Sequence, residues 1–320
     1  MNRKRWAALA VFLVLFTSLA LNPYACLGLG VEDEKWAREV YQSGTGDSLA
    51  LIDLEGMIIS APDTPYLGDV DTQENFTDKM ESAFSSDDIE GIILRVNSPG
   101  GAVHKCDYIF NEILNLKEKY EKPLLVYMDE VAASGAYLIS ATADKIMANR
   151  HALTGALGVY TTTINVHQLA EEWGIESETF QSGQYKDMLN PLREVKDEER
   201  EIMQEVIDES FSFLIDSILE QREMERDELK ELADGRIYTG PQAEENELID
   251  AVGRMDDAIE EAAVLADTSD PEVLHYYTEP PSTFEMLLNR INAGLSGPEN
   301  LEEIIYQEYH HPRPMYLWKN

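Results

Sequence analysis

The sequence predicts an α/β fold in which helices flank a buried sheet. Short apolar runs, such as residues 91–96 (GIILRV) and 123–128 (PLLVYM), have the length and composition of buried strands. Segments with helical spacing of apolar residues alternate with these runs. This alternation is typical of a sheet covered by helices. An apolar N-terminal segment also predicts a transmembrane anchor ahead of the fold.

The predicted elements follow one another along most of the chain. Strands are expected at residues 48–60 (interrupted at Gly56), 91–96, 123–128, 145–148 and 177–182. Helices are expected at residues 71–84, 108–120, 131–146, 196–232 and 255–265. The stretch 196–232 is strongly acidic, and its apolar positions form a face that requires a partner.

Composition divides the chain into four regions. Residues 1–31 contain no acidic side chain and form the predicted anchor. Residues 32–47 are polar and are expected to form a stalk, and residues 48–268 hold the predicted sheet and helices. Residues 269–320 are rich in Pro, Tyr and His, which predicts an extended C-terminal arm.

The N-terminal segment predicts a location as well as an anchor. Arg3, Lys4 and Arg5 precede the apolar run, and such a basic flank stays in the cytoplasm. We therefore expect a single-pass protein of the cell membrane, with a cytoplasmic N-terminus and an extracytoplasmic folded domain. A cleaved signal peptide is the alternative, because small residues at 18–20 and 23–25 loosely fit cleavage sites.

Charge and motif content exclude several classes of partner. The chain carries 61 acidic against 25 basic side chains, a formal net charge of −36. Such a surface repels nucleic acid. The acidic excess is an adaptation either to a saline or alkaline exterior or simply to solubility. The sequence contains no HExxH motif, no paired Cys/His spacing and no coenzyme-binding signature, so we expect neither a metal nor a cofactor.

Two short segments after predicted strands could carry chemistry. In residues 97–101 (NSPGG), paired glycines let the backbone approach a ligand and present N–H groups to it, although a tight turn has the same composition. In residues 131–136 (VAASGA), Ser134 falls on the first turn of a predicted helix. Free N–H groups there favour developing negative charge, but a serine at a helix start is also a common cap.

A third segment, residues 181–187 (QSGQYKD), contains Lys186. A lysine is usually a solvated charge, and it can act as a general base only when it is neutral. Burial would have to lower its pKa from ~10.4 towards ~7–8. Asp187 would oppose that shift if its carboxylate came close, so we expect this carboxylate to point away.

Together these segments resemble the signal peptide peptidase A (SppA) family of serine proteases, in its half-length, single-domain form. The matching stretches are LRVNSPGGAV, VAASGAYLISATADKI, LTGALGVY, SGQYKDMLNP and DGRIYTGPQA. The resemblance implies a ClpP/crotonase-like fold, a peptidase domain at residues 48–268 and a Ser–Lys dyad. Ser134 matches the nucleophile, Lys186 the general base and Gly101 an oxyanion-hole donor, with the amide of Gly135 as its partner.

The sequence departs from the family at one position. Family members commonly carry, after LTG, a serine whose hydroxyl binds the lysine amine, whereas this chain has Ala156. Thr154, Ser182 or water would then orient the lysine, or activity would be reduced.

The resemblance also implies an assembly and a substrate. Family members of this length form rings, octamers above all, in which neighbouring protomers supply the serine and the lysine. The expected function is a membrane-anchored endopeptidase that degrades remnant signal peptides and other hydrophobic peptides. A catalytically weakened oligomeric scaffold is the main alternative, and an acyl-CoA enzyme of the same fold is disfavoured.

Two further features leave alternatives open. A Ser–His–Asp site would need His151, His104 or His167, none of which lies in a recognised motif, so each is expected to be an ordinary histidine. The C-terminal HHPRPMYLWKN is basic and aromatic on an acidic chain. It is either a floppy tail or a segment that docks on its own oligomer and occupies the substrate cleft.

Overall fold

The computed structural model describes residues 36–59, 73–278 and 315–317. The predicted anchor at residues 1–31 lies outside these ranges. Among the described residues, no helix has both the length and the apolar character needed to cross a bilayer.

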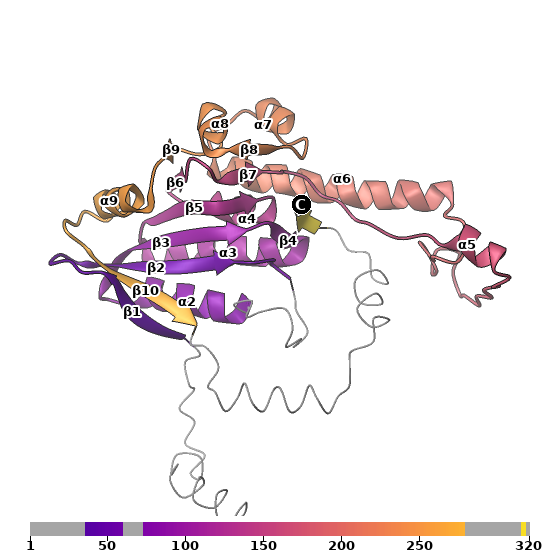
Figure 1. The fold of residues 1–320 in the computed structure, drawn as a ribbon, viewed down its shortest axis with the longest axis horizontal. Helices are drawn as coiled ribbons and strands as arrows, with labels where there is room; N and C mark the ends of the chain where they lie inside the picture. Colours follow the sequence, from indigo (N-terminus) through magenta and orange to yellow (C-terminus); the bar gives the residue numbers. More distant parts are fainter. Residues whose placement is uncertain (1–35, 60–72, 279–314, 318–320) are drawn as a thin grey trace, which may run out of the picture. The chain divides into compact units, whose positions relative to one another are not determined.

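The predicted α/β architecture is confirmed: a central, largely parallel sheet carries helices on both faces (Figure 1). Within the described residues, nine strands form this sheet. The main path runs through β1 (Trp36–Gln42), β10 (Glu272–Thr278), β2 (Ser48–Glu55), β3 (Ile89–Ser98), β5 (Leu124–Ala133), β6 (Lys145–Ala148) and β9 (Ala251–Val252). Two short strands, β7 (Leu153–Gly155) and β8 (Ile237–Thr239), continue from the end of β5. The strands from β10 to β9 along the path pair in parallel, and β1 pairs antiparallel at the edge.

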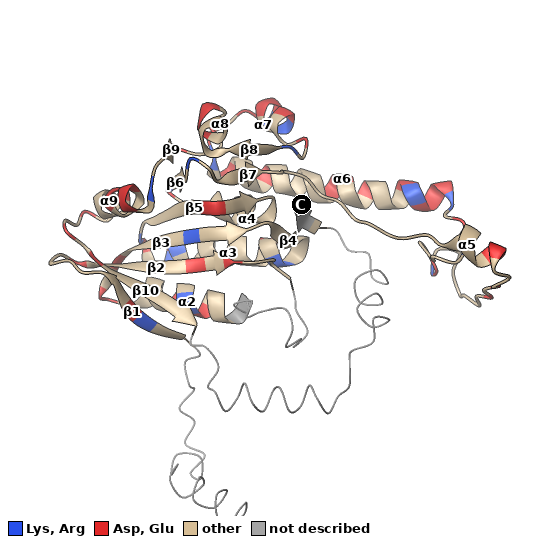
Figure 2. Ribbon diagram, viewed as in Figure 1, with Lys and Arg blue, Asp and Glu red and all other residues tan. Residues whose placement is uncertain are grey.

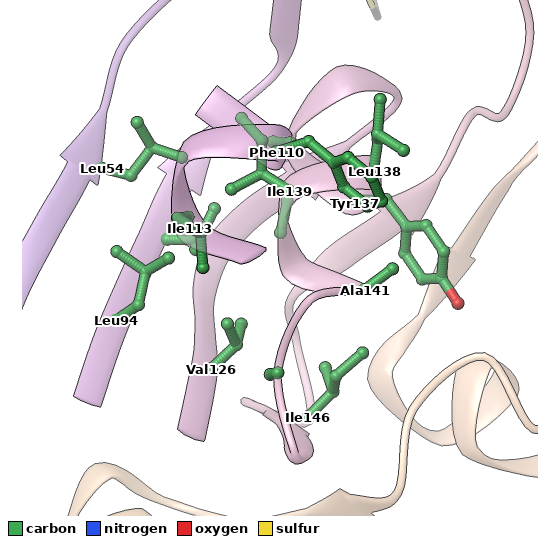
Figure 3. Close-up of a cluster of buried hydrophobic side chains, with 14 of the residues drawn as sticks. Leu54, Leu94, Phe110, Ile113, Val126, Tyr137, Leu138, Ile139, Ala141 and Ile146 are labelled. Atoms are coloured by element: carbon green, nitrogen blue, oxygen red, sulfur yellow. The ribbon is translucent and has the colours of Figure 1, made fainter. Parts of the chain in front are cut away.

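Each face of the sheet has its own apolar core. The larger core lies under α2 (Gln73–Ser85), α3 (Val103–Tyr120) and α4 (Gly135–Ser140). In Figure 3, Leu94 and Val126 from the strands face Phe110 and Ile113 of α3. The smaller core packs α9 (Met255–Leu265) on the opposite face. This two-sided burial explains why the central strands read as continuous apolar runs.

The remaining helices lie beyond the sheet. They are α5 (His167–Glu172), α6 (Asp197–Gln221), α7 (Arg226–Leu232) and α8 (Gly240–Glu245). Figure 2 shows acidic residues, in red, along α6, α7, α8 and α9. The long helix α6 also exposes Val206 and Phe213, so part of its apolar face has no partner within the described chain.

Three predicted elements differ from the structure. The segment 131–146 is not one helix: β5 extends to Ala133, α4 is short, and β6 begins at Lys145. The strand expected at residues 177–182 is absent, because those residues are exposed and have no neighbouring strand with which to pair. The helix expected at 196–232 is two helices, separated at residues 222–225.

A partly buried ionic cluster links three strands on the α9 face. Arg95 of β3 binds Asp53 of β2 through Nε and Nη2, at 2.7 and 2.8 Å from the two carboxylate oxygens. His275 of β10 places Nε2 at 2.9 Å from Asp53 Oδ2. Burial alone would raise the pKa of Asp53, but the hydrogen bonds from His275 and Arg95 outweigh it and lower that pKa to about 2.

Replacing Asp53 with asparagine is expected to lower the free energy of unfolding by about 1–3 kcal/mol at pH 7, because the partly buried Arg95 loses its carboxylate partner. The folded pKa lies below the unfolded value of about 3.9, so this stabilisation is complete above that value and disappears as the pH falls towards 2. Denaturation of wild type and Asp53→Asn between pH 2 and 7 tests this. Asp256→Asn, in an exposed pair with Arg254, is the control and should change little. Equal stability of wild type and Asp53→Asn at pH 7 would contradict the prediction.

Candidate active site

Ser134 occupies a strained turn between a strand and a helix. It follows β5 directly and is the N-cap residue of α4, with φ 56° and ψ −116°. Positive φ is costly for a residue with a Cβ and occurs where the surroundings enforce it. Here the Ser134 N–H donates to the Gly155 carbonyl at 2.8 Å, and the Ser134 carbonyl accepts from Leu138 N–H at 3.1 Å. The turn is therefore held from both the β7 side and the helix side.

The hydroxyl of Ser134 is buried and makes no hydrogen bond within the described residues. The residue is 1% exposed, and its side chain does not cap α4. The nearby buried hydroxyls of Ser140 and Thr142 each donate to a backbone carbonyl, at 2.7 Å in both cases. Leaving a buried hydroxyl without a partner costs about 1–3 kcal/mol, which a purely structural serine would avoid.

Gly101 lies in β4 (Gly100–Ala102), a short strand beside α4 (Figure 1). On one edge, Ile58 N–H donates to Gly100 O at 2.9 Å and Ala102 N–H donates to Ile58 O at 2.8 Å. Because successive peptide groups of a strand face opposite edges, the N–H and C=O of Gly101 face the other edge. A Cβ at Gly101 would lie 1.9 Å from the Ile58 carbonyl oxygen, so only glycine fits.

An extended segment of the same chain occupies that other edge. The strand β11 (Met315–Leu317) pairs antiparallel with β4, and Tyr316 lies opposite Gly101. On its far side, Met315 and Tyr160 exchange two backbone hydrogen bonds of 2.9 and 3.1 Å. The structure thus favours docking of the C-terminal tail over a floppy tail. It also shows that β4 and Tyr160 together bind a peptide in extended form.

Gly135, Thr154 and Ala156 surround the Ser134 turn. Gly135 is the first residue of α4, where a helix leaves N–H groups without intrahelical acceptors. Thr154 is buried in β7, and its hydroxyl donates to the Ala132 carbonyl at 2.6 Å. Ala156 has φ 48° and is almost completely buried. The Thr154 hydroxyl proton is therefore already hydrogen-bonded to the backbone, and Ala156 has no hydroxyl.

Lys186 and Ser182 lie apart from this turn within one chain. Both are exposed, and Lys186 sits in a series of turns between α5 and α6. Figure 1 shows that this segment runs with α5 beyond the sheet, at the N-terminal end of α6. Since Ser134 Oγ has no hydrogen-bond partner among the described residues, Lys186 of the same chain makes no hydrogen bond to it.

The carboxylate beside Lys186 points away, as expected. Asp187 binds Arg193, with 2.8 Å between Arg193 Nε and Asp187 Oδ2. The hydrogen bond from Arg193 lowers the pKa of Asp187, so that carboxylate stays ionised and engaged. The Asp187–Arg193 contact is not predicted from the sequence because it depends on the turns between these two residues. The pairing edge at Ile58 is not predicted because it joins two segments that no local motif connects.

The histidines considered from the sequence do not contact Ser134. His104 and His151 are exposed, and His167 pairs with Glu171 at 3.6 Å. Within the part of the chain that the structure describes, no group of His, Cys, Asp and Glu side chains could hold a metal ion.

Comparison with known proteins identifies the class. The model of peptidase family S49 matches residues 116–269. A candidate protease of Methanocaldococcus jannaschii is 33% identical over 232 residues, 72% of this chain and 72% of the relative. A candidate signal peptide peptidase SppA of Enterococcus faecium is 29% identical over 86% of this chain and 85% of the relative. The chloroplastic serine protease SPPA of Arabidopsis thaliana is 31% identical over 82% of this chain and 39% of that longer protein.

These relatives define a serine protease. The chain belongs to peptidase family S49, the family of the SppA proteases. Among solved structures, the 1510-N membrane-bound stomatin-specific protease covers 74% of this chain at 15% identity, with a TM-score of 0.46, and 99% of that structure is matched. This likeness is too weak to support a residue-level comparison.

Removing residues 310–320 is expected to lower KM for peptide substrates roughly 2- to 10-fold with little change in kcat, because a tethered strand competes for the β4 edge. Steady-state kinetics of the full-length and shortened proteins measure this. Tyr316→Pro, which removes a backbone N–H facing β4, should act like the truncation, whereas Tyr316→Ala keeps that N–H and should act less. Unchanged KM in the truncated protein would show that the strand does not compete.

Proposed function

We propose that the protein is an extracytoplasmic, membrane-anchored endopeptidase of ClpP/crotonase-like fold that uses a Ser–Lys dyad. Ser134 is the nucleophile, Lys186 the general base, and the amides of Gly101 and Gly135 form the oxyanion hole. The observation that carries the proposal is the buried, unpaired Ser134 hydroxyl on a strained turn beside an edge that binds an extended peptide. Membership of family S49 supports the same chemistry.

The reaction follows from these roles. Neutral Lys186 takes the proton of Ser134, and the oxygen attacks the carbonyl of a peptide paired with β4. The N–H of Gly101 faces that edge, so it stabilises the negative charge that develops on the carbonyl oxygen. Protonated Lys186 then gives its proton to the leaving amine. Water, activated by the lysine, releases the acyl group from Ser134.

The dyad requires more than one protomer. In one chain the Ser134 hydroxyl has no partner, and Lys186 lies on an exposed segment. The same segment exposes Trp173 and Phe180, at 72% and 88%, as a surface that meets another protein does. A homo-oligomeric ring, octameric as the family resemblance implies, would bring the Lys186 segment of one protomer to Ser134 of its neighbour.

The substrates proposed are remnant signal peptides and other hydrophobic peptides. The relative from Enterococcus faecium carries the name of a signal peptide peptidase, which supports this substrate class. The occupant of the β4 edge, Met-Tyr-Leu, is itself apolar. An N-terminal anchor at residues 1–31, with a cytoplasmic N-terminus, would hold the enzyme where signal peptides are released.

A catalytically weakened scaffold is the second candidate, favoured by one observation. The Thr154 hydroxyl donates its hydrogen bond to the Ala132 carbonyl, and Ala156 lacks a hydroxyl. Neither residue therefore donates a hydrogen bond to a lysine amine. If Ser182 or water does not replace that hydrogen bond, the lysine is poorly oriented and turnover is low.

The first experiment compares the full-length protein with Ser134→Ala and Lys186→Ala. Hydrolysis of a fluorogenic hydrophobic peptide is followed from pH 6 to 10. Both substitutions are expected to lower kcat by at least ~1,000-fold, because a nucleophile and its base act as a unit. The wild-type rate should rise with one basic group whose pKa lies below ~10.4. Wild-type turnover equal to that of the variants would favour the scaffold.

A mixing experiment tests the shared site. When Ser134→Ala and Lys186→Ala proteins are dissociated, mixed in equal amounts and reassembled, about a quarter of the wild-type activity is expected, since one junction in four pairs an intact serine with an intact lysine. Each variant reassembled alone is the control. Mixtures as inactive as the separate variants would place both residues of a site on one protomer.

A further inference from the structure

A single arginine holds the turn that presents Lys186. Asp187 follows Lys186 in the chain. Arg193 binds both carboxylate oxygens of Asp187, at 2.8 Å from Nε and 2.9 Å from Nη2. Its Nη2 also donates to the Asp187 backbone carbonyl at 2.8 Å. One side chain therefore fixes both the backbone and the carboxylate of the residue adjacent to the proposed base.

The same guanidinium ties this turn to α6. Arg193 Nη2 lies 2.6 Å from Glu199 Oε1, and Nη1 lies 3.0 Å from Glu199 Oε2. The Glu199 side chain is 0% exposed and lies in the first turn of α6, where it also accepts from the Lys196 N–H at 3.3 Å. The planar guanidinium of arginine has five N–H donors and can bind two carboxylates at once. The ammonium of a lysine lacks this fixed geometry. Arg193 thus couples the position of Lys186 to the helix.

The electrostatics of the cluster are those of a permanent ion triad. The charged groups that face the Asp187 carboxylate are Arg193 on the same segment, together with Lys196 and the Glu199 that shares the guanidinium. Hydrogen bonds from Arg193 lower the pKa of both Asp187 and Glu199, and those carboxylates raise the pKa of Arg193. All three groups therefore stay charged across the range in which a lysine base would titrate.

We propose that Arg193 is a positioning residue for the general base: it orients the turn that carries Lys186 and holds the Asp187 carboxylate away from the lysine amine. The inference rests on the proposed function. A free carboxylate beside the amine would stabilise the ammonium form and raise the pKa of Lys186. Arg193 prevents this by binding both carboxylate oxygens of Asp187.

The two roles of Arg193 separate in a set of variants of the full-length protein. Arg193→Gln is expected to lower kcat about 10- to 100-fold at pH 8 with little change in KM, because the base is misplaced and more of it is protonated. The ascending limb of its pH–rate profile should move to higher pH by about one unit. Adding Asp187→Asn to Arg193→Gln removes the freed carboxylate. The ascending limb of the pH–rate profile should then return to its wild-type position, while kcat stays reduced. Arg193→Lys, which keeps the charge but not the fork, should restore kcat in part.

Arg200→Gln is the matched control. Arg200 lies on α6 near Glu199 but is exposed, and its Nε is 3.9 Å from exposed Asp197. This variant should keep wild-type kcat and pH profile. Thermal stability and oligomer size are measured for every variant. If Arg193→Gln does not assemble, Arg193→Lys replaces it in the kinetic comparison.

Three outcomes would overturn the inference. Wild-type kinetics in Arg193→Gln would show that the clamp is dispensable. If Arg193→Gln lowered kcat equally at every pH, and the double variant had the same pH profile, Arg193 would be only a structural residue. If the wild-type protein shows no turnover that depends on Ser134, the proposed function fails first, and this result is distinct from the other two.

Discussion

The strained turn at Ser134 is the constraint on which the rest of the candidate site depends. A non-glycine residue at positive φ costs about 1–3 kcal/mol and persists only where the surrounding structure enforces it. Here β7 lies alongside the end of β5 and accepts the Ser134 N–H, while α4 starts at the next residue and is buried throughout. Because these elements pack in the main core, the Ser134 backbone is held by the same packing that forms the sheet. The neighbouring strand β4 then supplies an edge that pairs with an extended segment, Met315–Leu317, and that is proposed to hold a substrate in the same way.

The two proposed catalytic side chains have opposite environments. Ser134 lies in the dense core, whereas Lys186 lies on an exposed segment that carries large apolar side chains. If the two side chains form the proposed dyad, such a site would become complete only on assembly, and an isolated protomer would be inert. Assembly has an electrostatic cost, because a chain with a net charge of −36 repels its own copies, and salt screens that repulsion. Within one protomer, the contacts of Arg193 with Asp187 and Glu199 already tie the Lys186 turn to α6.

Local sequence identified the elements whose pattern is set by burial. The apolar runs within β2, β3, β5 and β6 were predicted as strands because they are covered on both faces. The predicted helix at 131–146 was wrong because small residues such as Ala132 and Ala133 suit either state, and pairing with β7 made them a strand. The predicted strand at 177–182 was wrong because a strand needs a neighbour, and none lies beside those residues.

The sequence by itself determined the α/β class, the protease family and the residues Ser134, Lys186 and Gly101 as candidates, since these rest on short motifs and local spacing. Only the tertiary structure decided how they are arranged. The pairing of Gly101 with Ile58 on one edge and Tyr316 on the other joins segments far apart in the chain. So does the hydrogen bond between Ser134 and Gly155. Contacts of this kind depend on the packing of whole elements, and no local pattern of residues encodes them.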